Sequence, residues 1–222
     1  IICGDTPLLR KETLLSLIQT HQGNPETAAT VLTAVLPNPT GYGRIIRRAG
    51  QVVGIVEQKD ATDEQQALKE INTGIYCFKS EKLAEALSSL TNDNAQGEYY
   101  LTDTLSYLVE KGEKVGAVVL ADIEEAIGVN SRSQLAQVEK ILRQRKNEEL
   151  MDAGVTLVDP SSTFVDEDVE IGPDTVIQPF TWLEGKTKIG EGCVIGPNSR
   201  LQNVTVGDEV ELHFTYAHDC VI

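Results

Sequence analysis

The stretch IGPDTVIQPFTWLEGKTKIGEGCVIGPNSRLQNVTV (residues 171–206) decides the fold of the last third of this chain. An aliphatic residue recurs there at every sixth position, and a small residue follows each one four positions later. The aliphatic column is Ile171, Ile177, Leu183, Ile189, Ile195 and Leu201, and the small column is Thr175, Thr181, Thr187, Cys193, Ser199 and Thr205. A helix would scatter these columns around its axis, and a single strand would require alternation. The six-residue period therefore predicts a parallel β-helix.

The repeat assigns a role to each position of a coil. The aliphatic side chain points to the axis, and the small one fits the tight interior beside a corner. We expect Gly172, Gly190 and Gly196 to take the bends, and Val206 and Leu212 to continue the aliphatic column after one slip of phase. The alternative, an antiparallel sheet with chance spacing, does not explain an aliphatic residue at six successive positions of the six-residue period.

Both ends of the chain predict an internal piece of a longer protein. It opens on Ile1-Ile2-Cys3-Gly4-Asp5, which resembles a buried strand running into a loop. It closes on the apolar run at residues 218–222, after room for about three coils from residue 165 onward. Solenoids need a polar cap at each end, so an uncapped coil is expected to continue.

Composition excludes several classes of partner. The formal charge of -15 comes without a basic stripe, which argues against nucleic acid. No apolar run approaches the roughly 18 residues of a membrane span, so we expect a cytoplasmic protein with no membrane partner.

The cysteines and histidines do not form a recognisable metal motif. Cys3, Cys77, Cys193 and Cys220 are far apart and lack Cys-x-x-Cys spacing, so they are expected to be reduced and mostly buried. The two histidines His213 and His218 are close enough to bind a metal as a pair, but two surface histidines explain them as well.

Residues before the repeat predict an α/β body, because strand patterns alternate with helix patterns. We expect helices at 7–20, 80–90 and 99–111, with Thr6 as the first N-cap, and strands at 27–36, 44–48, 51–57, 72–78 and 115–120. A long polar helix then runs from a cap at Asn130-Ser131 to Gly154, either as a rigid connector or packed into one domain. The predicted domains are 1–129, a linker helix at 130–153, and the β-helix at 154–222.

Two acidic residues are candidates for ligand binding. Asp5 follows an apolar stretch beside Gly4, at the kind of strand end where α/β sheets bind ligands. A carboxylate there suits Mg²⁺, although a capping or turn aspartate explains it equally well. Glu57 ends a strand, where it could accept a hydrogen bond from a sugar hydroxyl or remain a solvated edge residue.

Six motifs in order resemble one family, the bacterial bifunctional N-acetylglucosamine-1-phosphate uridyltransferases and glucosamine-1-phosphate acetyltransferases. The motifs are ICGDTPL (2–8), NPTGYGRI (38–45), GIVEQKDA (54–61), EINTG (70–74), NAQGEYYLTD (94–103) and GVN (128–130). The similarity covers nearly the whole chain. It implies the C-terminal part of a Rossmann-like nucleotidyltransferase domain, a linking helix and a left-handed parallel β-helix of hexapeptide repeats.

The resemblance also implies a site. Asp5 and Asn130 would hold Mg²⁺. The sugar-nucleotide pocket would be lined by Cys3, Gly4, Asp5, Gly43, Glu57, Asn72 and Asn130, with only the backbone of Cys3 taking part. N-acetylglucosamine 1-phosphate would attack the α-phosphate of UTP in line, giving UDP-N-acetylglucosamine for cell-wall precursor synthesis. Positioning and metal charge would drive this step without a covalent nucleophile.

The full-length family carries a second activity, acetyl transfer from acetyl-CoA to glucosamine 1-phosphate, and it forms homotrimers. In this family the glycine-rich phosphate loop would lie before Ile1 and the acetyltransferase residues beyond Ile222. We therefore expect no complete catalytic set, only weak binding of UDP-N-acetylglucosamine, and no turnover by this chain alone. The alternatives are a non-catalytic sugar-nucleotide-binding or assembly subunit and a hexapeptide acyltransferase.

Overall fold

The computed structural model describes all residues from Ile1 to Ile222. They form two compact units, Ile1–Asn130 and Ser131–Ile222, and each is described by itself. The long polar helix belongs to the second unit, while the three-part division into domains stays a prediction. None of the helices combines the length and the apolar character needed to cross a membrane.

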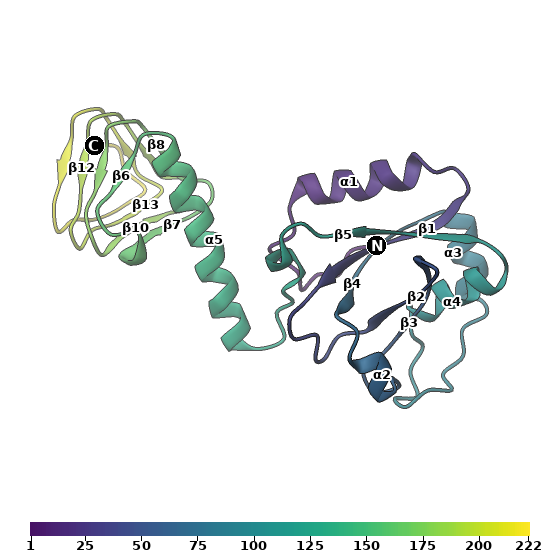
Figure 1. Ribbon diagram of the computed structural model, residues 1–222. Coiled ribbons are helices and arrows are strands. Elements are labelled where there is room, and N and C mark those ends of the chain that lie inside the picture. Colours follow the sequence, from purple (N-terminus) through teal and green to yellow (C-terminus); the bar gives the residue numbers. More distant parts are fainter. The chain divides into compact units, whose positions relative to one another are not determined.

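The first unit is built on a five-stranded mixed sheet with the order β3-β2-β4-β1-β5 (Figure 1). β1 is antiparallel to β4 and parallel to β5, and β2 and β3 form an antiparallel hairpin. The strands are β1 (Thr27–Val35), β2 (Arg44–Arg48), β3 (Gln51–Val56), β4 (Glu70–Phe78) and β5 (Lys114–Val119). The α/β prediction is confirmed.

Helices cover both faces of this sheet. The elements are α1 (Lys11–Gln22), α2 (Asp63–Gln66), α3 (Ser80–Leu87), α4 (Asp103–Glu110) and the 3-10 turn η1 (Ile123–Ala126). Val31 of β1 shares a core cluster with Leu105 of α4, while its neighbour Leu32 packs in a second cluster with Leu17 of α1. Successive side chains of a strand point to opposite faces, so β1 is buried on both faces, from Thr27 to Ala34.

The start of the chain differs from the prediction. Residues 1–3 form no strand, and Ile1 and Ile2 are about half exposed. Only Ile1 pairs with β4, through two backbone hydrogen bonds with Tyr76 of 3.0 Å or less. Thr6 is not a cap either, because α1 begins at Lys11 with Arg10 in the N-cap position, and the Thr6 hydroxyl donates to the Cys3 carbonyl instead.

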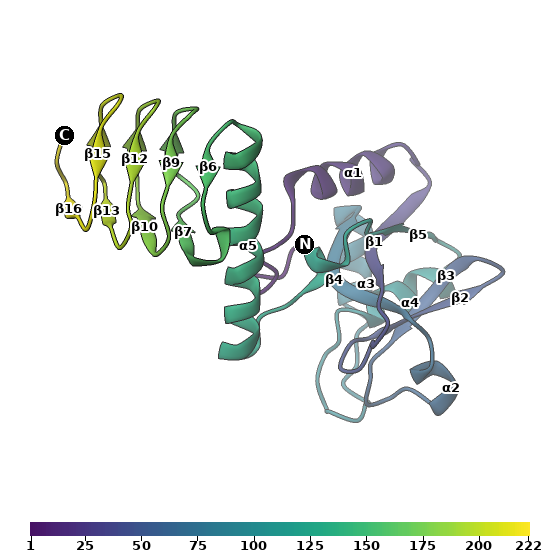
Figure 2. The ribbon, with the colours of Figure 1, turned by 60° about the vertical axis from the view of Figure 1, so that its left-hand side comes forward.

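The second unit begins with α5 (Arg132–Asp152) and continues as a parallel β-solenoid, whose stacked coils are seen in Figure 2. Ser131 caps the helix by accepting from the amide of Gln134 at 3.2 Å, and Gly154 ends it at φ +95°. Three sheets follow, ordered β15-β12-β9-β6, β16-β13-β10-β7 and β14-β11-β8. The predicted solenoid is confirmed, with about four coils rather than three because the first coil starts directly after α5.

Each coil contributes short strands to these sheets. The strands are β6 (Thr156–Leu157), β7 (Thr163–Val165), β8 (Glu170–Ile171), β9 (Val176–Ile177), β10 (Thr181–Glu184), β11 (Lys188–Ile189), β12 (Val194–Ile195), β13 (Arg200–Gln202), β14 (Thr205–Val206), β15 (Glu211–Leu212) and β16 (Tyr216–His218), with the 3-10 turn η2 (Pro160–Ser162) before β7.

The aliphatic column fills the solenoid as predicted. Ile177 and Leu183 are fully buried, and Leu150 of α5 joins the same core cluster. The small column is buried except at Thr205, which is exposed. Val204 is buried in its place, because the phase slip shortens the repeat by one residue there.

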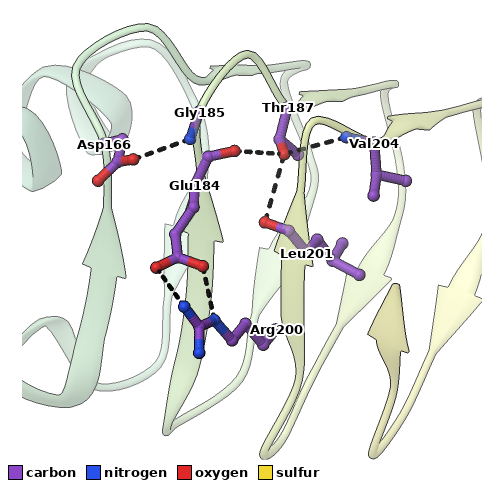
Figure 3. A network of polar contacts seen from close by, with 7 residues as sticks. All are labelled: Asp166, Glu184, Gly185, Thr187, Arg200, Leu201 and Val204. Atoms are coloured by element: carbon purple, nitrogen blue, oxygen red, sulfur yellow. Dashed lines mark hydrogen bonds and ion pairs between the residues drawn. The ribbon is translucent and has the colours of Figure 1, made fainter. Parts of the chain in front are cut away.

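Hydrogen bonds link neighbouring coils, as shown in Figure 3. The buried Thr187 hydroxyl donates to the Glu184 carbonyl at 2.8 Å and accepts from the Val204 amide at 3.3 Å. Outside, the Arg200 guanidinium holds the Glu184 carboxylate through two hydrogen bonds of 2.6 and 3.0 Å. The small column therefore also satisfies backbone groups that the tight turns leave buried.

Gly172 and Gly190 serve close stacking rather than bending. The left-handed backbone at the corners falls on other residues, such as Asp174 at φ +61°. A methyl group on Gly172 would lie 2.7 Å from the Gly190 carbonyl carbon, and one on Gly190 would lie 2.7 Å from that of Gly207. All three glycines stand directly before turns or bends, and of the three only Gly196, at φ +99°, has a left-handed backbone.

Gly190→Ala should therefore destabilise the solenoid by about 1–3 kcal/mol, because the added methyl overpacks the coil above it. Gly207→Ala is the matched control, since its methyl would only reach ordinary contact at 3.6 Å. Denaturant unfolding followed by fluorescence of Trp182, the single tryptophan, reports on this unit. Equal losses in the two variants would show that coil spacing is not the constraint.

Candidate functional site

A bulge in β4 shapes the site of the first unit. Val31 of β1 pairs with Tyr76, yet Thr33, two residues on, pairs with Asn72, so β4 carries extra residues at this point. Gly74 lies within them at φ +79°. The buried Thr73 hydroxyl donates to the Leu32 carbonyl at 2.8 Å across the irregular stretch. Bulges of this kind turn side chains away from the regular strand alternation, often beside active sites.

Asn72 stands at the start of this bulge. Its Oδ1 accepts from the Gly74 amide at 3.0 Å and from the Tyr76 hydroxyl at 2.9 Å. Its backbone amide donates to the Gly43 carbonyl at 2.9 Å, which ties the loop before β2 to β4. The residue is half-buried, so part of it faces solvent.

Cys3 contacts the same bulge through its side chain. Its thiol donates to the Gly74 carbonyl at 3.3 Å, and a methyl group on Gly74 would come within 2.8 Å of the sulfur. Burial raises the pKa of the Cys3 thiol, and the nearby Asp5 carboxylate raises it further, so the group stays protonated as a donor. That only the Cys3 backbone meets a ligand stays a prediction.

Glu57 lies opposite Gly43 at the end of β3. A methyl group on Gly43 would lie 3.2 and 3.3 Å from the two carboxylate oxygens, so glycine leaves them space. The Thr102 hydroxyl donates to Glu57 Oε1 at 3.1 Å. Burial raises the pKa of Glu57, opposed by the Thr102 hydrogen bond and reinforced by the carboxylates of Asp103 and Asp60.

Asp5 and Asn130 come together around Gly128, although they are far apart in sequence. The Asp5 carbonyl accepts from the Val129 amide at 2.8 Å. A methyl group on Gly128 would lie 3.5 Å from Asp5 Oδ2 and 3.8 Å from Asn130 Nδ2. One carboxylate and one amide suit Mg²⁺, which commonly takes few protein oxygens and keeps several waters.

The predicted site residues thus form two neighbouring groups. Cys3, Gly43, Glu57 and Asn72 surround the bulge, while Asp5 and Asn130 flank Gly128; Gly4 joins the two groups along the chain, with open space around its α-carbon. No cluster of three or more His, Cys, Asp and Glu side chains suited to a metal occurs in the structure.

Sequence reasoning missed Tyr76, Thr102 and Gly128. A glycine inside a strand pattern, here Gly74, is a known signal for a bulge and could have pointed to the contacts around Asn72. Thr102 and Gly128 lie within two of the six motifs, but no pattern gave either a role, because their roles depend on contacts between distant segments.

The remaining candidates lie outside this site. His213 hydrogen-bonds the Gly196 carbonyl and His218 the Asp219 carboxylate, so they have separate contacts on the solenoid surface. The cysteines were expected to be mostly buried, which is wrong. Only Cys193 is buried, and two of the other three are exposed.

Comparison with known proteins identifies the class. Residues 1–155 match the nucleotidyl transferase family, and the chain therefore belongs to it. The predicted enzyme class and the resemblance noted from the six motifs are confirmed.

The particular relatives are proteins called bifunctional protein GlmU. The chain is 54% identical to that of Caldanaerobacter subterraneus subsp. tengcongensis over 94% of its own length and 45% of the relative. It is 52% identical to that of Clostridioides difficile, over 96% and 46% of the two lengths. It is 49% identical to that of a Geobacillus strain, over 100% of its own length and 48% of the relative. The chain thus spans about half the length of the curated relatives it matches.

Thr102→Val should raise the pKa of Glu57 further, because it removes a hydrogen bond that stabilises the ionised carboxylate. In a ¹³C NMR pH titration, Glu57 should titrate above its ordinary range in the unmodified chain and higher still in the variant. The control is Glu70, whose pKa is lowered by its hydrogen bond with Arg47 and should not move. An unchanged or lower Glu57 midpoint would contradict this account.

Proposed function

We propose that the first unit provides the sugar-nucleotide part of a uridyltransferase site. The whole protein would make UDP-N-acetylglucosamine and pyrophosphate from UTP and N-acetylglucosamine 1-phosphate. The observation that carries this proposal is the meeting of Asp5 and Asn130 at Gly128, beside the cluster around the β4 bulge. Membership of the nucleotidyl transferase family and similarity to the GlmU proteins support it.

Each residue would have a defined task. Asp5 and Asn130 would hold Mg²⁺, which stabilises the charge that develops during phosphoryl transfer. Glu57 would accept from a sugar hydroxyl, and Asn72 would donate from its amide nitrogen. Gly43 would leave room for the sugar beside the Glu57 carboxylate. The site would work by positioning, since the reaction needs no covalent nucleophile.

We assign the solenoid to the second activity of the whole protein, acetyl transfer from acetyl-CoA to glucosamine 1-phosphate, within a homotrimer. The support is the hexad solenoid and the word bifunctional in the names of the relatives. A cytoplasmic location, without nucleic-acid or membrane partners, agrees with the charge of -15 and with substrates such as UTP and acetyl-CoA.

Calorimetry with UDP-N-acetylglucosamine, with and without Mg²⁺, tests the proposal. We expect weak binding that Mg²⁺ strengthens. Asp5→Ala should weaken binding by roughly tenfold in Mg²⁺ and abolish the metal effect, because the hard oxygen ligand is lost. Asp63→Ala, on the exposed first turn of α2, is the matched control and should change nothing.

The other outcomes separate the alternatives. Ligand heat that ignores both Mg²⁺ and Asp5→Ala would refute the metal assignment and favour a non-catalytic sugar-nucleotide-binding subunit. Absence of any ligand heat at millimolar concentration would refute the sugar-nucleotide site and leave the acyltransferase interpretation of the solenoid.

A further inference from the structure

We infer that Tyr76 is a positioning residue, which together with the Gly74 amide holds the side-chain amide of Asn72 so that its nitrogen faces the sugar nucleotide. The inference rests on the proposed function, because it assigns a role at the same site. It comes from the hydrogen bonds within the β4 bulge.

The orientation of the Asn72 amide follows from its partners. A backbone N–H can only donate, so the amide atom facing Gly74 at 3.0 Å must be the oxygen. The Tyr76 hydroxyl, at 2.9 Å from that same oxygen, must then donate as well. Rotating the amide by half a turn would place an NH₂ group against the Gly74 N–H and lose that bond, and the Tyr76 hydroxyl would have to accept instead of donate. The Gly74 amide therefore sets which atom faces inward, and the Tyr76 hydroxyl adds a second bond that holds the oxygen there.

Tyr76 is well suited to hold this orientation. Its side chain is 4% exposed, and its ring packs in the core cluster of Ile45 and Leu105. Its backbone amide donates to the Ile1 carbonyl, and its backbone carbonyl accepts from the amino group of Ile1. Burial raises the pKa of the hydroxyl far above its ordinary value, and the nearby Glu57 and Cys3 raise it further, so the proton is retained for donation.

The amide nitrogen is the group left for a ligand. Asn72 Nδ2 makes no hydrogen bond within the chain, and it is not among the polar side-chain atoms that are buried without a partner. Because the nitrogen can only donate, it would recognise an acceptor oxygen. A hydroxyl, carbonyl or phosphate oxygen of a sugar nucleotide meets that requirement.

A double-mutant cycle tests the inference, with affinity for UDP-N-acetylglucosamine measured by NMR titration of the full 222-residue chain. Tyr76→Phe keeps the ring and removes the hydroxyl, so affinity should fall about two- to tenfold, as expected for one lost hydrogen bond. In the Asn72→Ala background the same change should have no further effect. Tyr107→Phe is the matched control, since its hydroxyl bonds Glu85 elsewhere in the same unit.

A loss of equal size in both backgrounds would overturn the inference, because Tyr76 would then act on the fold and not through Asn72. An unchanged affinity in Tyr76→Phe alone would overturn it too.

A measurement without ligand distinguishes a failure of this inference from a failure of the proposed function. Side-chain NMR relaxation should find the Asn72 amide rigid in the unmodified chain and more mobile in Tyr76→Phe. An order parameter below about 0.6 in the unmodified chain would overturn the inference, whether or not the ligand binds. Absence of ligand binding with a rigid amide that loosens in Tyr76→Phe would retain the positioning role and reject the proposed function.

Discussion

The bulge in β4 is the feature on which the first unit depends. β4 must pair with β1 on one side and with β2 on the other, and the extra residues around Gly74 interrupt the regular alternation between them. This places the side chain of Asn72 within reach of the Tyr76 hydroxyl and brings Cys3 against Gly74. In a regular strand Asn72 and Tyr76 would share a face but lie roughly 13 Å apart, because each residue advances about 3.3 Å along the strand.

A second constraint, coil spacing, governs the solenoid. Successive coils approach so closely at Gly172 and Gly190 that a methyl group would touch the backbone above. The interior column of threonines bonds carbonyls and amides of adjacent coils, so apolar packing and polar satisfaction use the same positions. In both units, glycine occurs where another part of the chain approaches too closely to leave room for a side chain.

Electrostatics sets the character of the candidate site. Glu57 lies near Asp60 and Asp103, and burial with these neighbours favours its neutral form. The Thr102 hydroxyl opposes that tendency by stabilising the anion.

The sequence by itself determined the solenoid, the α/β body and the family, because a six-residue period and six ordered motifs are local patterns that survive without coordinates. It also supplied the candidate residues, from Asp5 to Asn130. Only the tertiary structure decided that Thr205 turns outward, that Gly172 serves stacking, and that the Tyr76 hydroxyl bonds the amide oxygen of Asn72. These outcomes depend on contacts between segments distant in the chain, and no local spacing encodes such distances.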